Sequence, residues 1–254
     1  MQTIALALLM LGGSVFSMTC SSFNHGDLPC VDVWRCNVAS TSSIEVNKLS
    51  NGLGSSESYS VVNMCFDDYT NPDEAYLYVT NTAYEQKYST PTTYTQCNDP
   101  IFYADVAEFF VAPNMEANPQ CYNELDISPS NVMFDAGIYN PNLNGTGMVG
   151  TDFDCATSGI SNDVVVDSAS QTWTATMAFP FSLLNCPYNC PLKKYCGHST
   201  PNNLYRANFY RINELQPTNK CSSSTCEYMA WSPTMANPPN FHVPTQFGYL
   251  VLQL

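Results

Sequence analysis

Positive charge is scarce in this chain. Its 254 residues include 8 Lys and Arg against 22 Asp and Glu, which gives a formal net charge of -14 at pH 7. Binding to nucleic acid requires clustered cations that contact phosphates, and the nearest approach to a cluster here is the pair Lys193 and Lys194. We therefore expect no nucleic-acid partner, and no polybasic patch for a membrane surface.

Long apolar runs are also lacking beyond the first residues. No later run approaches the roughly 18 residues that span a bilayer, so we expect no membrane insertion. Residues 1–17 combine an apolar run from Ile4 to Leu11 with a short Val15-Phe16-Ser17 end, which is typical of a secretory signal peptide. The first three residues carry no positive side chain, so a buried strand or helix remains the alternative. The expectation is a secreted, extracellular protein.

All 12 cysteines follow residue 17, and their number is even. In an oxidising compartment they most simply form disulfides, whose pairing this pattern leaves open. A metal site is the alternative because Cys186, Cys190 and Cys196 are closely spaced, but a zinc ribbon needs paired C-x-x-C motifs, which the chain lacks. The triplet that begins at Asn144 is an N-glycosylation acceptor in a loop rich in Gly, Asn and Pro, in keeping with export.

No stretch of the chain sustains a helical apolar period. Instead, short runs rich in Val, Ile, Phe, Tyr and Thr recur between clusters of Asn, Asp, Pro and Gly. This pattern predicts an all-β protein, a two-sheet antiparallel β-sandwich. The expected strands lie near residues 60–66, 75–81, 106–112, 121–127, 132–138, 164–166, 172–179, 205–212 and 248–252. Residues 18–58 form a Cys-rich N-terminal segment, residues 59–254 the sandwich domain, and residues 185–203 a Cys/Pro-rich insertion.

Polar residues alternate with apolar ones in three of these strands. Because successive side chains of a strand point to opposite faces, the polar ones are expected on the outer face, away from the core. They are Glu108, Glu124, Asp126, Asn208 and Tyr210. Carboxylate and amide groups suit sugar hydroxyls, and exposed aromatic rings suit the C–H faces of a sugar. An ordinary solvated sheet surface is the alternative.

Ordered blocks over roughly residues 61–254 resemble carbohydrate-binding modules of family 9, β-sandwiches of the DOMON-like group. The blocks begin at Asp105, Tyr122, Thr172, Tyr205, Tyr228 and Asn240 and read DVAEFF, YNELDISP, TWTATMAFP, YRANFYRI, YMAWSPT and NFHVPTQFG. The resemblance implies a carbohydrate-binding protein without catalysis that assists polysaccharide recognition or breakdown, with an oligo- or polysaccharide as partner.

In the members that this chain resembles, two aromatic rings sandwich a terminal sugar and polar residues on the sheet bind its hydroxyls. The resemblance places the rings at Phe102 and Phe241. It places the polar positions at Glu108, Asp126, Asn208 and Tyr210. This chain has Phe where those members have Trp, and Asp126 where they have an arginine. A Phe ring gives less stacking area, and an ordinary core role is the alternative for both rings.

Other functions remain open on smaller sets of residues. Asp67, Asp68 and Asp73 offer hard oxygen ligands for a structural Ca²⁺, although turn chemistry explains them equally. No other cofactor is expected. Some DOMON domains hold haem between Met and His, and His242 lies in a late loop, but no Met partner is defined.

An O-glycosyl hydrolase would need paired carboxylates, which Glu108, Glu124 and Asp126 can supply. Modules of the resembled family are usually attached to glycoside hydrolases, and we expect no catalysis by this chain itself. An extracellular structural or adhesion protein with the same fold and no sugar site is the main alternative.

Overall fold

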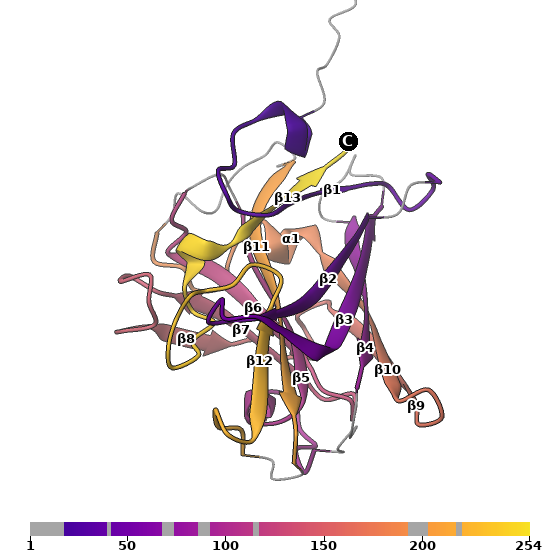
Figure 1. Ribbon diagram of the computed structural model, residues 1–254. Coiled ribbons are helices and arrows are strands. Elements are labelled where there is room, and N and C mark those ends of the chain that lie inside the picture. Colours follow the sequence, from indigo (N-terminus) through magenta and orange to yellow (C-terminus); the bar gives the residue numbers. More distant parts are fainter. Residues whose placement is uncertain are drawn as a thin grey trace, which may run out of the picture.

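The computed structural model describes residues 18–39, 42–67, 74–85, 92–113, 117–192, 203–216 and 220–254. Strands dominate this part of the chain and hydrogen-bond into one 13-stranded sheet (Figure 1). The strands are β1 (Cys30–Val33), β2 (Ser42–Leu49), β3 (Ser55–Phe66), β4 (Tyr76–Tyr84), β5 (Val106–Pro113), β6 (Cys121–Ile127), β7 (Met133–Tyr139), β8 (Val149–Asp152), β9 (Ser161–Asp167), β10 (Thr172–Pro180), β11 (Leu204–Glu214), β12 (Cys226–Ala230) and β13 (Gly248–Leu252). The helices are the short η1 (Cys20–Ser22), η2 (Ile101–Tyr103), α1 (Phe181–Leu184) and η4 (Pro244–Gln246).

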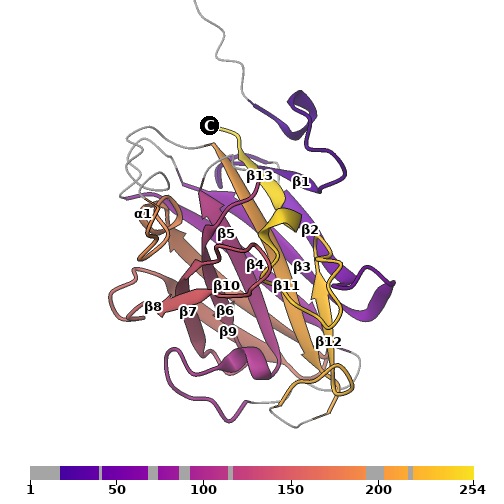
Figure 2. The ribbon, with the colours of Figure 1, turned by 90° about the vertical axis from the view of Figure 1, so that its left-hand side faces the viewer.

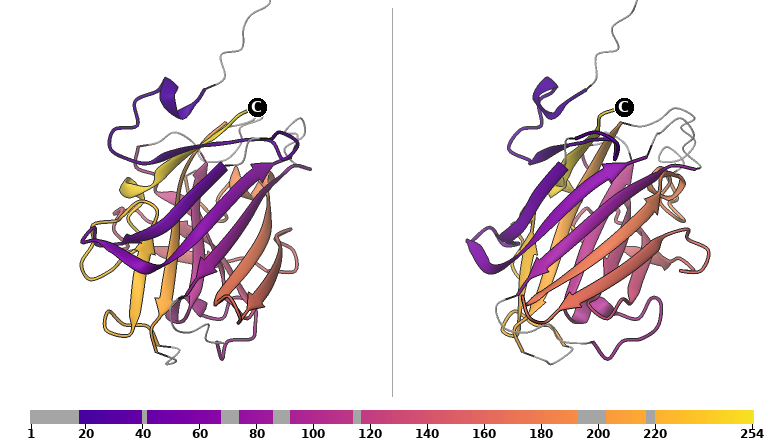
Figure 3. Two further views of the ribbon diagram at one scale, coloured as in Figure 1. Left: turned by 45° about the vertical axis from the view of Figure 1, so that its right-hand side comes forward. Right: turned by 90° about the vertical axis from the view of Figure 1, so that its right-hand side faces the viewer.

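The sheet curls so that its two halves face each other. The strand order is β8-β7-β6-β5-β11-β12-β2-β3-β4-β10-β9, and β12 joins the halves by pairing with β2. Figure 3 shows β2, β3, β4, β10 and β9 as one layer in front of the other, and in Figure 2 the layer that contains β5, β6 and β11 faces the viewer. The predicted all-β, two-layer antiparallel architecture is confirmed, with β1 added to β13 as a parallel pair.

The main apolar core lies between the two layers. Phe109 of β5 stacks on Phe209 of β11 with ring centroids 4.6 Å apart, and Trp173 and Phe179 of β10 enter from the other layer. All four side chains are buried. Burial of one such ring stabilises the folded state by about 1.5–3 kcal/mol. The apolar residues of each strand therefore determine which of its faces points to the core.

The structure adds strands that the sequence analysis left out. Within residues 18–58, β2 buries only Ile44 and Val46 as apolar side chains and alternates them with exposed Ser43 and Glu45. With only two buried apolar residues, the alternation in β2 is too weak to predict a strand. The hydrogen-bonded pairing of β2 with β3 and β12 stabilises it instead. Through the pairing of β2 with β12, the N-terminal segment connects the two layers.

Among the described residues, disulfides connect irregular segments to the sheet or to one another, in keeping with the predicted disulfide framework. They join Cys20 to Cys30, Cys36 to Cys65, Cys97 to Cys155, Cys121 to Cys190 and Cys221 to Cys226. The described part of the Cys/Pro-rich insertion also lies against β7 at Gly137, where any Cβ would clash with the Tyr188 carbonyl oxygen. Among the residues that the structure describes, no helix is long and apolar enough to cross a membrane.

Candidate functional site

The expected polar residues share one face of the layer that contains β5, β6 and β11. Tyr210 of β11 lies opposite Glu108 of β5, and Glu108 lies opposite Asp126 of β6. In the next row Asn208 lies opposite Phe110, which lies opposite Glu124. Directly opposed residues point to the same side of a sheet, so the alternation argument placed these side chains correctly.

This outer face is covered by protein. The segment 231–247 and helix η2 lie over it, and a second apolar cluster forms there around Phe110, Tyr122, Tyr210, Phe241 and Phe247. Aromatic residues therefore lie among the carboxylates on a face that strand alternation predicted to carry hydrogen-bonding groups. The covering segment is distant in sequence from β5 and β6, which is why strand alternation alone does not reveal it.

Asn208 and Tyr210 hold the covering segment in place. The Asn208 amide donates to the Ser232 carbonyl oxygen at 2.7 Å and accepts from the Ser232 N–H at 3.0 Å. The Tyr210 hydroxyl donates to the Phe241 carbonyl oxygen at 3.0 Å, and the two rings stack with centroids 4.1 Å apart. Both side chains are fully buried, and neither lines the adjacent cavity. Their polar groups bond to backbone rather than face a ligand.

A cavity of about 430 Å³ opens between η2, the sheet face and the covering segment. Phe102 of η2 and Phe241 of the covering segment both line it, together with the carboxyl groups of Glu108 and Glu124. Its other walls come from Tyr103, Phe134, Ala136, Ile138, Met148, Gly150, Ile212, Tyr228, Pro239, Asn240 and His242. Its volume falls in the range of small-ligand sites, about 300–1,000 Å³. Two aromatic rings and two carboxyl groups thus border one space.

Three carboxyl groups lie close together beside this cavity, two of them in its lining, and we call Glu108, Glu124 and Asp126 the outer carboxylate cluster. One oxygen from each lies within 4.8 Å of the others. Their exposed fractions are 3, 5 and 1%. Neither oxygen of Asp126 has a hydrogen-bond partner in the described structure, and no described Lys or Arg forms an ion pair with any of the three. The cluster is therefore buried acid without a compensating cation from the described chain.

Burial dominates the electrostatics of the cluster, because removing a carboxylate from water disfavours its charged form. It raises the pKa of Glu108 and of Asp126 well above the usual range, and the neighbouring carboxylates add to the rise. It raises the pKa of Glu124 to about 8, to which the charge of Asp152 contributes.

His242 lies beside the cluster at the cavity wall. Its Nδ1 and the Tyr122 hydroxyl are 2.9 Å apart, and its Nε2 is 3.9 Å from Oε2 of Glu124. Burial lowers the pKa of His242 to about 4, so at pH 7 the ring is neutral and does not offset the acidic charge. Met148 also lines the cavity, but both ring nitrogens of His242 are directed at protein groups, an arrangement that does not favour iron ligation.

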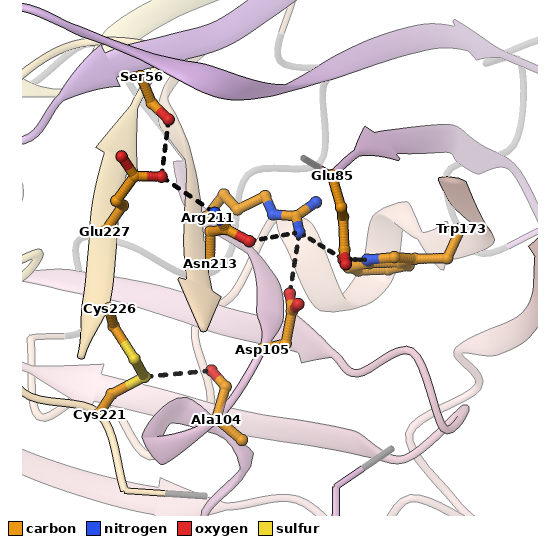
Figure 4. Close-up of polar contacts among 10 residues, drawn as sticks. All are labelled: Ser56, Glu85, Ala104, Asp105, Trp173, Arg211, Asn213, Cys221, Cys226 and Glu227. Atoms are coloured by element: carbon orange, nitrogen blue, oxygen red, sulfur yellow. Dashed lines mark hydrogen bonds and ion pairs between the residues drawn. A yellow bond between two sulfur atoms is a disulfide. The ribbon is translucent and has the colours of Figure 1, made fainter. Parts of the chain in front are cut away.

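A second group of buried charges lies on the inner face of the same strands, and we call it the arginine cluster. One terminal nitrogen of Arg211 is 2.8 Å from Oε1 of Glu85 and 3.0 Å from Oδ1 of Asp105 (Figure 4). The Trp173 indole also donates to Glu85 at 2.8 Å, and the guanidinium lies over the Trp173 ring. These contacts are internal to the fold, so the arginine cluster has a structural role.

Other predicted sites lie elsewhere. Of the proposed calcium ligands, Asp68 and Asp73 lie outside the described residues, and Asp67 accepts a hydrogen bond from the Tyr78 hydroxyl at 2.9 Å. Asn144 is exposed, and its side-chain oxygen accepts from the Thr146 N–H at 2.9 Å. Calcium at the aspartates and glycosylation at Asn144 stay predictions.

The sequence analysis did not connect Tyr228 or His242 to the ligand site. His242 follows Phe241 directly, so its proximity was a usable signal. Tyr228 belongs to β12, which was not predicted as a strand. Strand alternation placed Glu124 on the same outer face as Asp126, two residues later in β6, but the resemblance did not include Glu124 among the sugar-binding positions.

Comparisons with known proteins agree with the fold. No protein-family profile matches the chain. An extracellular protein from Arthroderma benhamiae is 31% identical over 109 residues, which are 41% of this chain and 48% of that protein, so the match spans about half the length of the relative. A crystal structure of a candidate carbohydrate-binding protein from Bacteroides uniformis aligns over 89% of this chain and 99% of that one, with 13% identity and a TM-score of 0.58.

Two solved structures of a family 9 carbohydrate-binding module from Caldicellulosiruptor kristjanssonii also align, each with 11% identity. The complex with cellotriose covers 89% of this chain and 94% of that one at a TM-score of 0.47. The complex with glucose covers 88 and 95% at 0.49. The similarity to the Bacteroides uniformis protein shows a shared fold, which confirms the expected sandwich architecture.

Proposed function

We propose that this chain is a secreted carbohydrate-binding protein that holds a saccharide without changing it chemically and assists the recognition or breakdown of a polysaccharide. The observation that carries the proposal is the cavity in which Phe102, Phe241, Glu108 and Glu124 meet. The disulfides and the extracellular relative support export.

The chemistry of the cavity suits a sugar ring. The C–H faces of a pyranose pack on the rings of Phe102 and Phe241, and its hydroxyls reach the carboxyl groups of Glu108 and Glu124. Asn208 and Tyr210 contribute by fixing the segment that carries Phe241. In this arrangement Asp126 acts from behind the cavity wall, through the other two carboxyl groups.

Binding fits the carboxyl groups better than glycoside hydrolysis does. Glycosidases separate their two carboxyl groups by about 5–9.5 Å so that a sugar or a water fits between them. One oxygen from each carboxyl group of the outer carboxylate cluster lies within 4.8 Å of the others, closer than the roughly 6.5–9.5 Å of an inverting enzyme, and Asp126 does not line the cavity. The proposal therefore assigns these groups to holding a ligand.

A glycan array probed with the oxidised protein tests this function. We expect binding to a defined set of glycans that Phe241→Ala abolishes, because the substitution removes one wall of the cavity. Tyr84→Ala is the matched control, since Tyr84 is an aromatic residue of the other layer that stacks on Tyr59. Loss of binding in Tyr84→Ala alone would place the sugar elsewhere. Absence of binding by the folded wild type would favour the structural or adhesion role.

A further inference from the structure

The outer carboxylate cluster has the geometry of a cation site. A Ca²⁺ ion binds oxygen ligands at about 2.3–2.6 Å, so two oxygens on one ion lie at most about 5 Å apart. The three carboxylate oxygens of Glu108, Glu124 and Asp126 satisfy this limit, because they all lie within 4.8 Å of one another. They come from adjacent positions on β5 and β6, which are held in register by the sheet.

Asp126 is the strongest single indication of a ligand. It is 1% exposed, it points into the cluster, and neither of its oxygens has a hydrogen-bond partner in the described residues. An unpartnered buried acceptor normally costs about 1–3 kcal/mol, and more for a charged group. The arginine cluster shows how this fold compensates buried acid elsewhere, with Arg211 between Glu85 and Asp105.

The nearest side chains do not supply that compensation. His242 is the basic group closest to Glu124, at 3.9 Å. Its Nδ1 already contacts the Tyr122 hydroxyl. Asp152 places a further negative charge near Glu124. A cation from solution can reach Glu108 and Glu124 because both border the cavity.

We propose that Glu108, Glu124 and Asp126 bind one Ca²⁺ ion at the wall of the cavity. The all-oxygen ligand set is that of a hard cation, and three carboxylates provide three to six of the six to eight oxygens that Ca²⁺ takes. The remaining positions face the cavity. There, and this part rests on the proposed function, neighbouring hydroxyls of the saccharide coordinate the ion, so that the sugar binds through the metal as well as against the two rings.

Calorimetric titration of CaCl₂ into the oxidised protein, previously treated with EDTA and dialysed, tests the site. We expect saturable binding that Asp126→Asn weakens about tenfold or more, because a charged ligand is lost. Asp163→Asn removes a carboxylate from an exposed position on β9 and should leave the binding unchanged. No saturable binding by the wild type would overturn the site, as would equal binding by Asp126→Asn.

A second measurement does not depend on the variant. Added CaCl₂ should raise the thermal midpoint of the wild type over its value in EDTA, because a ligand that binds the folded state stabilises it. Near-UV circular dichroism verifies that Asp126→Asn is folded. An unchanged midpoint at saturating CaCl₂ would contradict the site even if the variant did not fold.

Sugar titrations separate this inference from the proposed function. Cellobiose, or another glycan selected on the array, should bind the Ca²⁺-loaded protein at least about tenfold more tightly than the EDTA-treated protein. Equal affinity would overturn the metal bridge and leave sugar binding standing. Ca²⁺ binding without any sugar binding would leave the cation site standing and overturn the proposed function. Binding of glucosamine but not glucose by EDTA-treated protein would assign the carboxylates to an ammonium group and overturn the cation site.

Discussion

Two groups of buried acids lie on opposite faces of β5 and β11, and they differ in what neutralises them. In the arginine cluster, Arg211 contacts both Glu85 and Asp105 (Figure 4). Burial still raises the pKa of Asp105 well above its usual range, against the effect of Arg211. In the outer carboxylate cluster three acids meet, and the described chain brings no Lys or Arg to them.

Strand alternation produces the difference. Tyr210 and Arg211 are neighbours in β11, so they point to opposite faces of the sheet. Arg211 therefore points to the inner face, where it contacts Glu85 and Asp105, while the ring of Tyr210 points to the outer face. A buried ion pair is internal to the fold, whereas buried acid beside a cavity is left for a proton, a cation or a ligand. The comparison indicates a structural role for the arginine cluster and supports the binding role that we propose for the outer carboxylate cluster.

The largest expected effect comes from removing the cation of the arginine cluster. Arg211→Met leaves Glu85 and Asp105 buried without their partner, and we expect the free energy of unfolding to fall by about 3–5 kcal/mol. Urea denaturation measures it. Lys48→Met, at an exposed position of β2, is the control and should change stability by no more than about 0.5 kcal/mol. A loss below about 1 kcal/mol for Arg211→Met would show that Arg211 does not compensate the two buried acids, and would contradict the comparison.

Replacing one Glu by Gln should change the free energy of unfolding differently in the two clusters. Glu85→Gln removes a charge that Arg211 and the Trp173 indole both contact, so we expect a loss of about 1–3 kcal/mol. Glu108→Gln replaces a buried carboxyl group that lies among other acids and has no ion-pair partner among the described residues, so in EDTA at pH 7 we expect no loss, or a gain of up to about 1 kcal/mol. Urea denaturation of both variants tests this, and equal losses would show that the clusters are equivalent.

The third prediction concerns pH. The folded protein keeps the proton of Glu124 up to about pH 8, whereas an unfolded chain loses it near the ordinary value of 4.5. The folded state therefore binds more protons between these values, so this contribution to stability is complete below about pH 4.5 and is lost as the pH rises through about 8.

Urea denaturation in EDTA should accordingly show the free energy of unfolding falling steadily from pH 5 to pH 8. Glu124→Gln should reduce this fall, while Glu108 and Asp126, whose pKa values burial also raises, retain part of it. His242 is neutral over this range because burial lowers its pKa to about 4. An identical pH profile for Glu124→Gln would contradict the role of Glu124.

The sequence predicted the parts of this architecture that depend on local pattern. Alternation in β5, β6 and β11 placed Glu108 and Asp126 on one face with Tyr210, because the apolar residues between them must enter the core. The resemblance to carbohydrate-binding modules brought Phe102 and Phe241 together with them, although these two are distant in sequence.

The remaining features depend on contacts between distant segments. Asn208 was expected to face a ligand, but it bonds to Ser232 because the segment after β12 folds back over the sheet. Local pattern also did not show β2, whose inward residues are too few to stand out, or the pairing of Arg211 with Glu85, a residue 126 positions away.

The central claim is that the cavity between Phe102 and Phe241 holds a saccharide. The most direct test is calorimetric titration of the oxidised protein with glucose, cellobiose, xylobiose and a mixed glycan panel, in CaCl₂ and in EDTA, beside Phe102→Ala/Phe241→Ala. The account predicts saturable heat for at least one saccharide that the double variant loses while it remains folded. Undiminished heat in that variant, or no heat from the folded wild type with any saccharide, would contradict it.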